Sequence, residues 1–67
     1  MFEEHQCVKL RRPIPPMDKG AVGVVVMVYD FTERLGYEVE FVDREGFTLA
    51  LMTLRGEDLE PAGSVEG

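Results

Sequence analysis

A thiol and an imidazole lie two residues apart near the start of the chain, at Cys7 and His5. Residues at this spacing on a strand project from the same face, so the pair could serve as a nucleophile and its base. A cysteine nucleophile also needs an oxyanion hole and a cleft, and a chain of 67 residues has little material for either. We therefore expect Cys7 to be a half-buried small hydrophobe and His5 to be exposed, with no catalytic residues and no enzymatic activity.

The same spacing occurs at Glu38 and Glu40, whose carboxylates would stand about 7 Å apart on one strand face. Such a pair could hold a cation or receive an arginine. Two carboxylates without a third ligand make a poor metal site, and both side chains are expected in water. We interpret them as a solvated strand face, with a salt bridge to another subunit as the alternative. No metal and no cofactor are expected.

Positive charge is concentrated in one part of the chain. Residues 8–29 hold four Lys and Arg against one Asp, residues 30–67 hold three Arg against ten Asp and Glu, and the net charge is −6. Such asymmetry would let one copy attract another. The candidate charged contacts of the basic part are Lys9, Arg11, Arg12 and Lys19. They could contact phosphates while Tyr29 or Tyr37 stacks on bases, but the overall acidity disfavours nucleic acid as a partner.

Four apolar runs, separated by Gly, Pro and charged residues, predict an all-β domain. The expected strands span residues 5–10, 21–29, 37–43 and 47–54. Gly23 predicts a kink in the second strand, since glycine reaches positive φ without steric cost. Residues 43–46 predict a tight turn with Gly46 left-handed. Residues 30–36 are expected to form a polar connection, and residues 55–61 a single helical turn stopped by Pro61.

Strand alternation also predicts which side chains form the core. The expected core residues are Val8, Leu10, Val24, Val26, Val28, Val39, Phe41, Leu49, Leu51 and Leu59. The fourth run is apolar on both faces, so a second cover is needed, either the terminal segments folding back or another copy of the chain. The candidate interface residues are Phe2, Met27, Phe31, Ala50, Met52 and Leu54.

Several short motifs together resemble a family of small bacterial SH3-like barrels known only as domain of unknown function 4926. They are Gly20-Ala21-Val22-Gly23-Val24-Val25, Val28-Tyr29, Tyr37-Glu38-Val39-Glu40-Phe41-Val42-Asp43, Thr48-Leu49-Ala50-Leu51 and Asp58-Leu59-Glu60-Pro61. More distantly, the Gly-x-Val pattern is similar to KOW and translation-protein SH3-like barrels, which bind RNA or ribosomal proteins. The resemblance implies a five-stranded, strongly bent antiparallel barrel whose last strand follows a short 3-10 turn, with no catalytic residues to assign.

These observations predict one small SH3-like barrel domain over residues 1–61 and a flexible tail over 62–67. A single cysteine fits a reducing compartment, and no apolar run approaches the roughly 18 residues that span a bilayer, so we expect a cytoplasmic protein that does not bind membranes. We expect a non-enzymatic protein-interaction module that self-associates into a homo-oligomer. The alternatives are an RNA- or ribosome-associated KOW-like module and an accessory or antidote protein that binds a larger partner.

Overall fold

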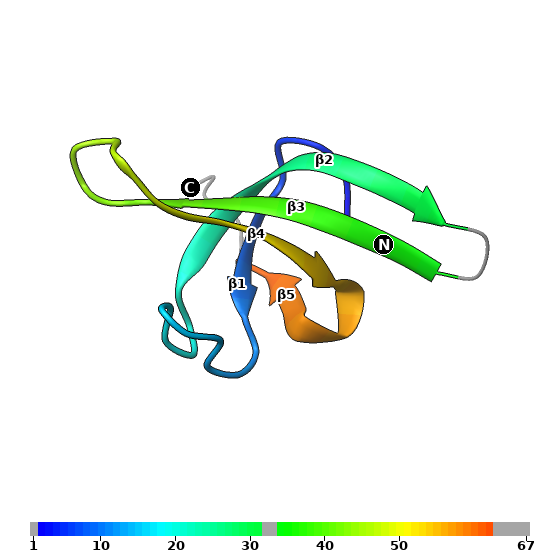
Figure 1. Cartoon of the computed structure of the whole chain (residues 1–67), viewed down its shortest axis with the longest axis horizontal. Coiled ribbons are helices and arrows are strands. Elements are labelled where there is room, and N and C mark those ends of the chain that lie inside the picture. The colour runs from blue at the N-terminus through cyan, green and yellow to red at the C-terminus, as the bar shows by residue number, and fades with distance from the viewer. Residues whose placement is uncertain (1, 32–33, 63–67) are drawn as a thin grey trace.

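The computed structural model describes residues 2–31 and 34–62, apart from the side chains at 31 and 34. In this part of the chain five antiparallel strands form one sheet in the order β4-β3-β2-β1-β5 (Figure 1). The elements are β1 (Cys7–Leu10), β2 (Val22–Phe31), β3 (Arg34–Val42), β4 (Thr48–Arg55), the 3-10 turn η1 (Gly56–Asp58) and β5 (Leu59–Pro61). The predicted all-β class is confirmed. The sheet is not a strictly closed barrel, because β4 and β5 are its two ends.

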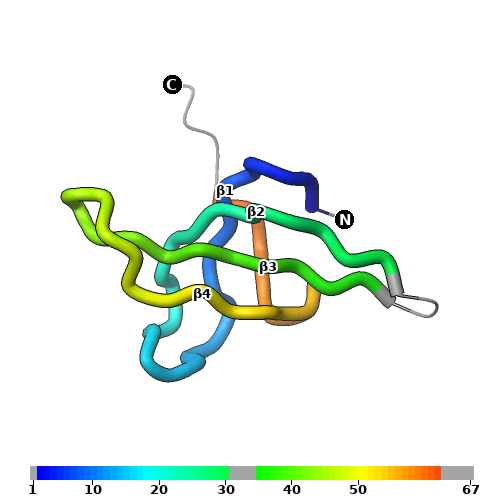
Figure 2. Tube along the Cα trace, turned by 45° about the horizontal axis from the view of Figure 1, so that its top comes forward, coloured from blue at the N-terminus to red at the C-terminus, as the bar shows by residue number. Residues whose placement is uncertain are grey.

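The sheet bends, so that β1 and β5 cross the long curved strands β2, β3 and β4 (Figures 1 and 2). Gly23 is buried on β2, opposite Val8. A Cβ at Gly23 would stand 2.8 Å from the carbonyl oxygen of Glu40 and 2.8 Å from Cγ1 of Val39. Glycine is therefore required here because β2 packs closely on β3, and not because of the positive φ that the sequence suggested.

The turns agree in part with the expectation. Gly46 has a φ of 91°, and Oδ1 of Asp43 accepts hydrogen bonds from the backbone N–H groups of Glu45 and Phe47, each 2.9 Å long. The turn at residues 43–46 is thus confirmed. The expected polar connection over residues 30–36 is instead mostly strand, since β2 runs to Phe31 and β3 begins at Arg34. The expected helical turn over residues 55–61 is shorter, and gives way to β5 at residue 59.

The core lies inside the bend of the sheet. Its buried side chains are Val8, Leu10, Val25, Tyr37, Val39, Phe41, Leu54 and Leu59. The sequence predicted correctly which side chains of β1 and β3 point into the core, and also the burial of Leu59. It predicted the wrong inward-facing side chains for β2 and β4.

On β2 the buried valine is Val25, whereas Val26 is 36% exposed and Val24 and Val28 are half-buried. Val25 lies opposite the inward Val39 and Val28 opposite the inward Tyr37, with an irregularity in the β2–β3 ladder between Val25 and Met27. An extra residue in one strand shifts the alternation by one, so the inward positions of β2 are odd-numbered before the irregularity and even-numbered after it. Val28 still packs against the core, but the predicted burial of Val24 and Val26 is corrected.

On β4 the predicted faces are exchanged. Leu49 and Leu51 were expected in the core and are 53% and 57% exposed. Ala50, Met52 and Leu54 lie opposite Phe41, Val39 and Tyr37, and therefore face inward. Residues directly opposite each other in a ladder share a face, so the inward set on β3 decides the inward set on β4.

Candidate functional site

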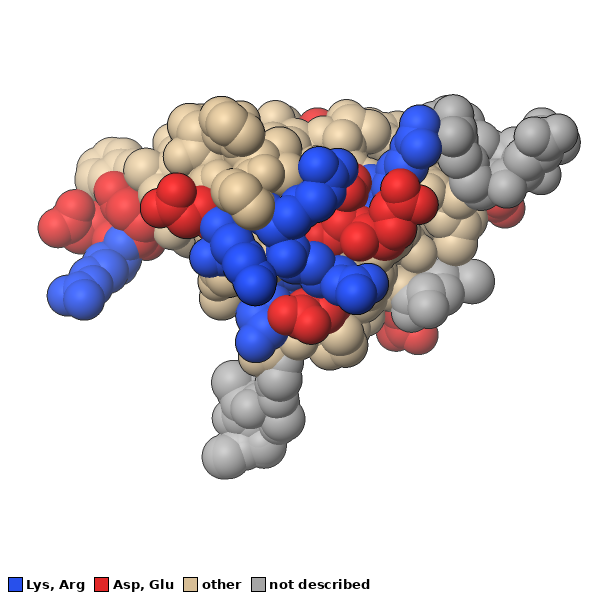
Figure 3. All heavy atoms as spheres, turned by 90° about the horizontal axis from the view of Figure 1, so that it is seen from below, with Lys and Arg blue, Asp and Glu red and all other residues tan. Residues whose placement is uncertain are grey.

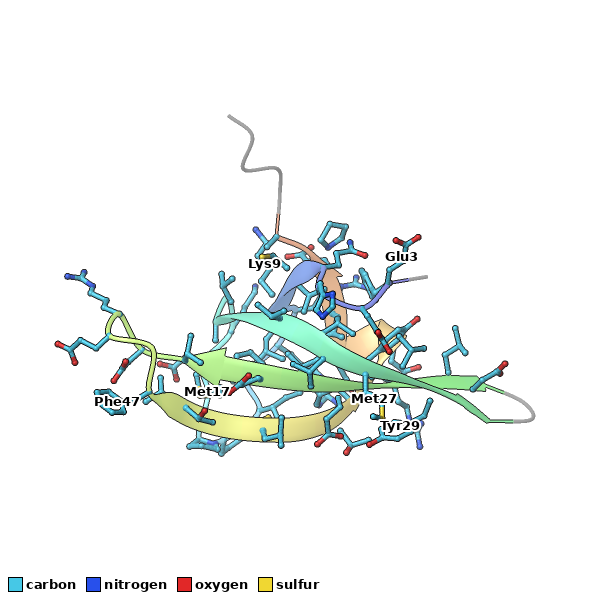
Figure 4. All side chains as sticks on the ribbon, turned by 90° about the horizontal axis from the view of Figure 1, so that it is seen from above. Glu3, Lys9, Met17, Met27, Tyr29 and Phe47 are labelled. Carbon is cyan, nitrogen blue, oxygen red and sulfur yellow. The ribbon has the colours of Figure 1, made fainter. Side chains whose placement is uncertain are left out.

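The outer side of β4 carries large apolar side chains in water. Phe47, just before the strand, is 69% exposed, and Leu49 and Leu51 are each more than half exposed. We call Phe47, Leu49 and Leu51 the β4 apolar face. Figure 4 shows Phe47 at the hairpin end of the sheet, well separated from Lys9. Isolated exposed leucines are common, but three large exposed apolar side chains within five residues are typical of an interaction surface.

Two carboxylates border this face on β3. Glu40 is directly opposite Leu51, and Glu38 is opposite Thr53. The hydroxyl of Thr53 donates to Oε1 of Glu38 and that of Thr48 to Oε2 of Glu40, both at 2.6 Å. The expectation that the two glutamates share an outer strand face is confirmed. Each glutamate accepts a hydrogen bond from a threonine of β4, so the two side-chain hydrogen bonds link β3 to β4.

β4 is also an edge of the sheet. In the described residues β4 pairs with β3 along one side. Along the other side of β4 there is no further strand in this part of the chain. An edge strand presents unpaired backbone N–H and C=O groups, which can pair with another chain. The β4 apolar face and the β4 edge are therefore adjacent features of one surface.

The remaining candidate interface residues occupy different places. Met27 lies on the outer face opposite Glu38 and is 46% exposed. Phe2 folds back onto the core: its ring meets the ring of Tyr37 edge-on at 5.3 Å, and its backbone N–H donates to the Tyr37 hydroxyl at 3.2 Å. Ala50, Met52 and Leu54 face inward, as described above. The side chain of Phe31 lies outside the described residues.

The basic residues gather on another side of the molecule, around the β1–β2 loop and η1 (Figure 3). Nζ of Lys9 lies 3.9 Å from a carboxylate oxygen of Glu60. Arg12 donates to Oδ1 of Asp58 through Nε at 3.0 Å and through Nη2 at 2.7 Å. Two of the four candidate charged contacts are thus paired with carboxylates of the same chain. Arg11 and Lys19 are exposed.

Asp58 is a buried carboxylate in this ion pair. Besides Arg12, the backbone N–H of Arg55 donates to its Oδ2 at 3.1 Å. Burial alone would raise the pKa of the Asp58 carboxyl, but the hydrogen bonds and the charges of Arg12 and Arg55 together outweigh it and lower the pKa. The ionised carboxylate therefore fastens the start of the β1–β2 loop to η1.

The thiol and imidazole do not form a site. Cys7 is exposed rather than half-buried, and His5 is exposed as expected. His5 has a φ of 72° and precedes β1, so the strand alternation that would place the two side chains together does not extend to it. Within residues 2–31 and 34–62, no group of three or more His, Cys, Asp or Glu side chains could hold a metal ion.

The family is decided by a match over residues 4–61 to the model of a domain of unknown function, DUF4926. The chain belongs to this family. No curated protein and no solved structure matches the chain. Across the described residues there is no helix with the length and apolar character needed to cross a membrane.

Sequence reasoning did not find the β4 apolar face, because it placed Leu49 and Leu51 in the core. The polar residues near the end of β4 could have indicated this exposed face. Thr53 and Arg55 share the odd-numbered alternation with Leu51, and both are exposed. A strand face that ends in two polar residues is the solvent face.

Proposed function

We propose that this DUF4926 protein is a non-enzymatic, SH3-like protein-interaction module that binds its partner through the β4 apolar face and the adjoining strand edge. The observation that carries the proposal is the exposure of Leu49 and Leu51 on an edge strand, with the exposed Phe47 just before it. Added strands bind a sheet edge by main-chain hydrogen bonds, and side-chain contacts beside the edge give specificity. β4 offers both kinds of contact.

The character of this surface supports binding rather than catalysis. Its side chains are apolar, and the two carboxylates beside it accept hydrogen bonds from Thr48 and Thr53. A general acid or base of this type needs a carboxyl with a strongly raised pKa, which burial in an apolar site would produce. Glu38 and Glu40 are instead partly exposed.

A nucleic-acid function receives less support from the charged residues of the molecule. Lys9 and Arg12 face Glu60 and Asp58, so carboxylates stand among the cations that would have to contact phosphates. Arg11 and Lys19 remain as exposed cations on that side. RNA binding is therefore the competing outcome of the photo-crosslinking experiment.

The test is site-specific photo-crosslinking in the native host with the full chain. A benzophenone amino acid replaces Leu49 on the β4 apolar face or Lys19 in the β1–β2 loop. We expect protein adducts from position 49. Leu51→Asp should abolish them, whereas Val22→Asp should not, because Val22 is equally exposed at 54% but lies on β2. RNA adducts from position 19 without protein adducts from position 49 would overturn the proposal.

A further inference from the structure

The two ends of the sheet are not equally protected against a further strand. β5 has three residues, ends in Pro61 and carries the charged Glu60. β4 has eight residues, no proline, and no charged side chain before Arg55. Short length, proline and charge are the usual devices that stop edge strands from pairing with another chain. β5 has all three, whereas β4 has a charge at its last residue only.

We propose that the partner on β4 is a second copy of this chain, whose β4 pairs antiparallel with it about a two-fold axis near Leu51. The inference rests on the proposed function, since it names the occupant of the same surface. The two sheets would join into one continuous sheet across the seam. An antiparallel pair of identical strands is self-complementary, which is the property that a two-fold interface requires.

The strand alternation fits this symmetry. Directly opposite residues share a face, so outer residues of one copy lie opposite outer residues of the other. With the axis near Leu51, the leucines at positions 49 and 51 of both copies form one apolar cluster on the outer side of the seam. Cross-strand apolar pairs of this kind contribute roughly 0.2 to 1 kcal/mol each. The inner residues Ala50, Met52 and Leu54 would extend the two cores toward each other.

The charges also fit an antiparallel arrangement. The net charge of −6 repels two copies in general, but β4 itself carries only the cation Arg55. In this register Arg55 of one copy lies opposite position 47 of the other, next to the turn that carries the exposed Glu45. Glu38 and Glu40 are on β3, one strand away from the seam, and accept hydrogen bonds from threonines. Arg55 of each copy therefore comes near Glu45 of the other, in a turn that also carries the exposed Arg44.

The size of the seam is sufficient for a modest dimer. Eight residues of antiparallel strand extend over about 27 Å. The exposed parts of Phe47, Leu49 and Leu51 amount to an area on the order of 350 Å² per copy. Strand pairing adds backbone area to this, which brings the total toward the roughly 800 Å² per partner of a standard interface.

Sedimentation velocity on the full chain tests the pairing, with the protein at about 100 µM, a concentration that populates weak dimers. We expect a dimer for the wild type, a monomer for Leu51→Arg, and a dimer for Val22→Arg, whose site matches Leu51 in exposure. Glu45→Arg should weaken association several-fold. Circular dichroism should show that each variant keeps its β fold, because all three side chains point into water.

Disulfide trapping gives a second, independent measurement. In a Cys7→Ser background, single cysteines replace Leu49, Leu51, Thr53 or Val22. Cα atoms of opposite residues in an antiparallel pair lie about 4.5 to 5.5 Å apart, within the range that a disulfide bridges. We expect Leu51→Cys to cross-link fastest under mild oxidation and Val22→Cys to cross-link slowest.

A wild-type monomer at this concentration, or a dimer that Leu51→Arg leaves intact, would overturn the inference. So would fastest trapping at Val22→Cys. The proposed function fails separately, since its evidence is the set of photo-adducts at position 49. A monomer that still gives Leu51-dependent adducts with a different protein refutes self-pairing and leaves the binding role of β4 in place.

Discussion

At one end of the sheet β5 is three residues long and is attached by contacts within the chain, whereas at the other end β4 is eight residues long and exposes leucines. Leu59 is buried opposite Leu10, and the neighbouring Asp58 binds Arg12. Within the described residues both end strands have a ladder on one side, β5 with β1 and β4 with β3, so the two ends differ in strand length and in exposed apolar side chains. The difference indicates where a small domain can bind a partner without losing its own fold.

The largest expected effect comes from removing the buried anchor of the β5 end. Leu59 is 2% exposed, and Leu59→Ala should lower the free energy of unfolding by about 2 to 5 kcal/mol, because it removes buried methyl groups and leaves a cavity. Leu51→Ala, at the β4 end, should change the unfolding free energy of the monomer far less. Urea denaturation at low protein concentration measures both. Equal losses would contradict the distinction between the two ends.

A smaller loss is expected from Asp58→Asn. The substitution removes the charge that Arg12 and the backbone N–H of Arg55 bind, and hydrogen bonds to charged groups contribute about 1.5 to 3 kcal/mol. Because the guanidinium of Arg12 is largely exposed, we expect the lower end of that range. The matched control is Glu57→Gln, at an exposed neighbouring acid, which should leave the urea midpoint unchanged.

The same carboxylate makes the β5 end sensitive to acid. The pKa of Asp58 is lower in the folded chain than its ordinary value of 3.8, so the folded state binds this proton less readily than the unfolded state does. Its stabilising contribution is therefore complete above about pH 5 and is lost as the pH falls through 3.8 and below. Urea midpoints measured from pH 6 to pH 2.5 should fall less steeply for Asp58→Asn than for Glu57→Gln. Identical slopes would exclude Asp58 as the titrating group.

The smallest effect is expected on the outer side of β4. Thr53→Val removes the hydroxyl that donates to Glu38 but keeps the shape and the strand preference of the residue. Both groups are accessible to water, so we expect a change in unfolding free energy of no more than about 0.5 kcal/mol. If Thr53→Val matched the loss from Asp58→Asn, the threonine–glutamate contacts would be principal supports of β4.

The sequence was sufficient to predict the inward-facing side chains of strands in which polar and apolar residues alternate without a break. Polar Glu38 and Glu40 between apolar neighbours set the phase of β3, and Gly46 marked the turn that follows. It was not sufficient where a ladder irregularity shifts the alternation, as between Val25 and Met27 on β2 and near residue 42 where β3 meets β4. A shift of one residue exchanges the two faces of everything after it. On β4 both faces are apolar up to Thr53, so composition alone could not show the exchange, and the exposed face was predicted as core.

The contact of Phe2 with Tyr37 bears on how this protein is best handled. The ring and the backbone N–H of Phe2 both contact Tyr37, whose side chain is part of the core, so a change at Phe2 would reach the packed interior. Reporter groups should therefore not replace Phe2. Dyes are better attached through the exposed thiol of Cys7, on a strand two places away from β3 in the sheet.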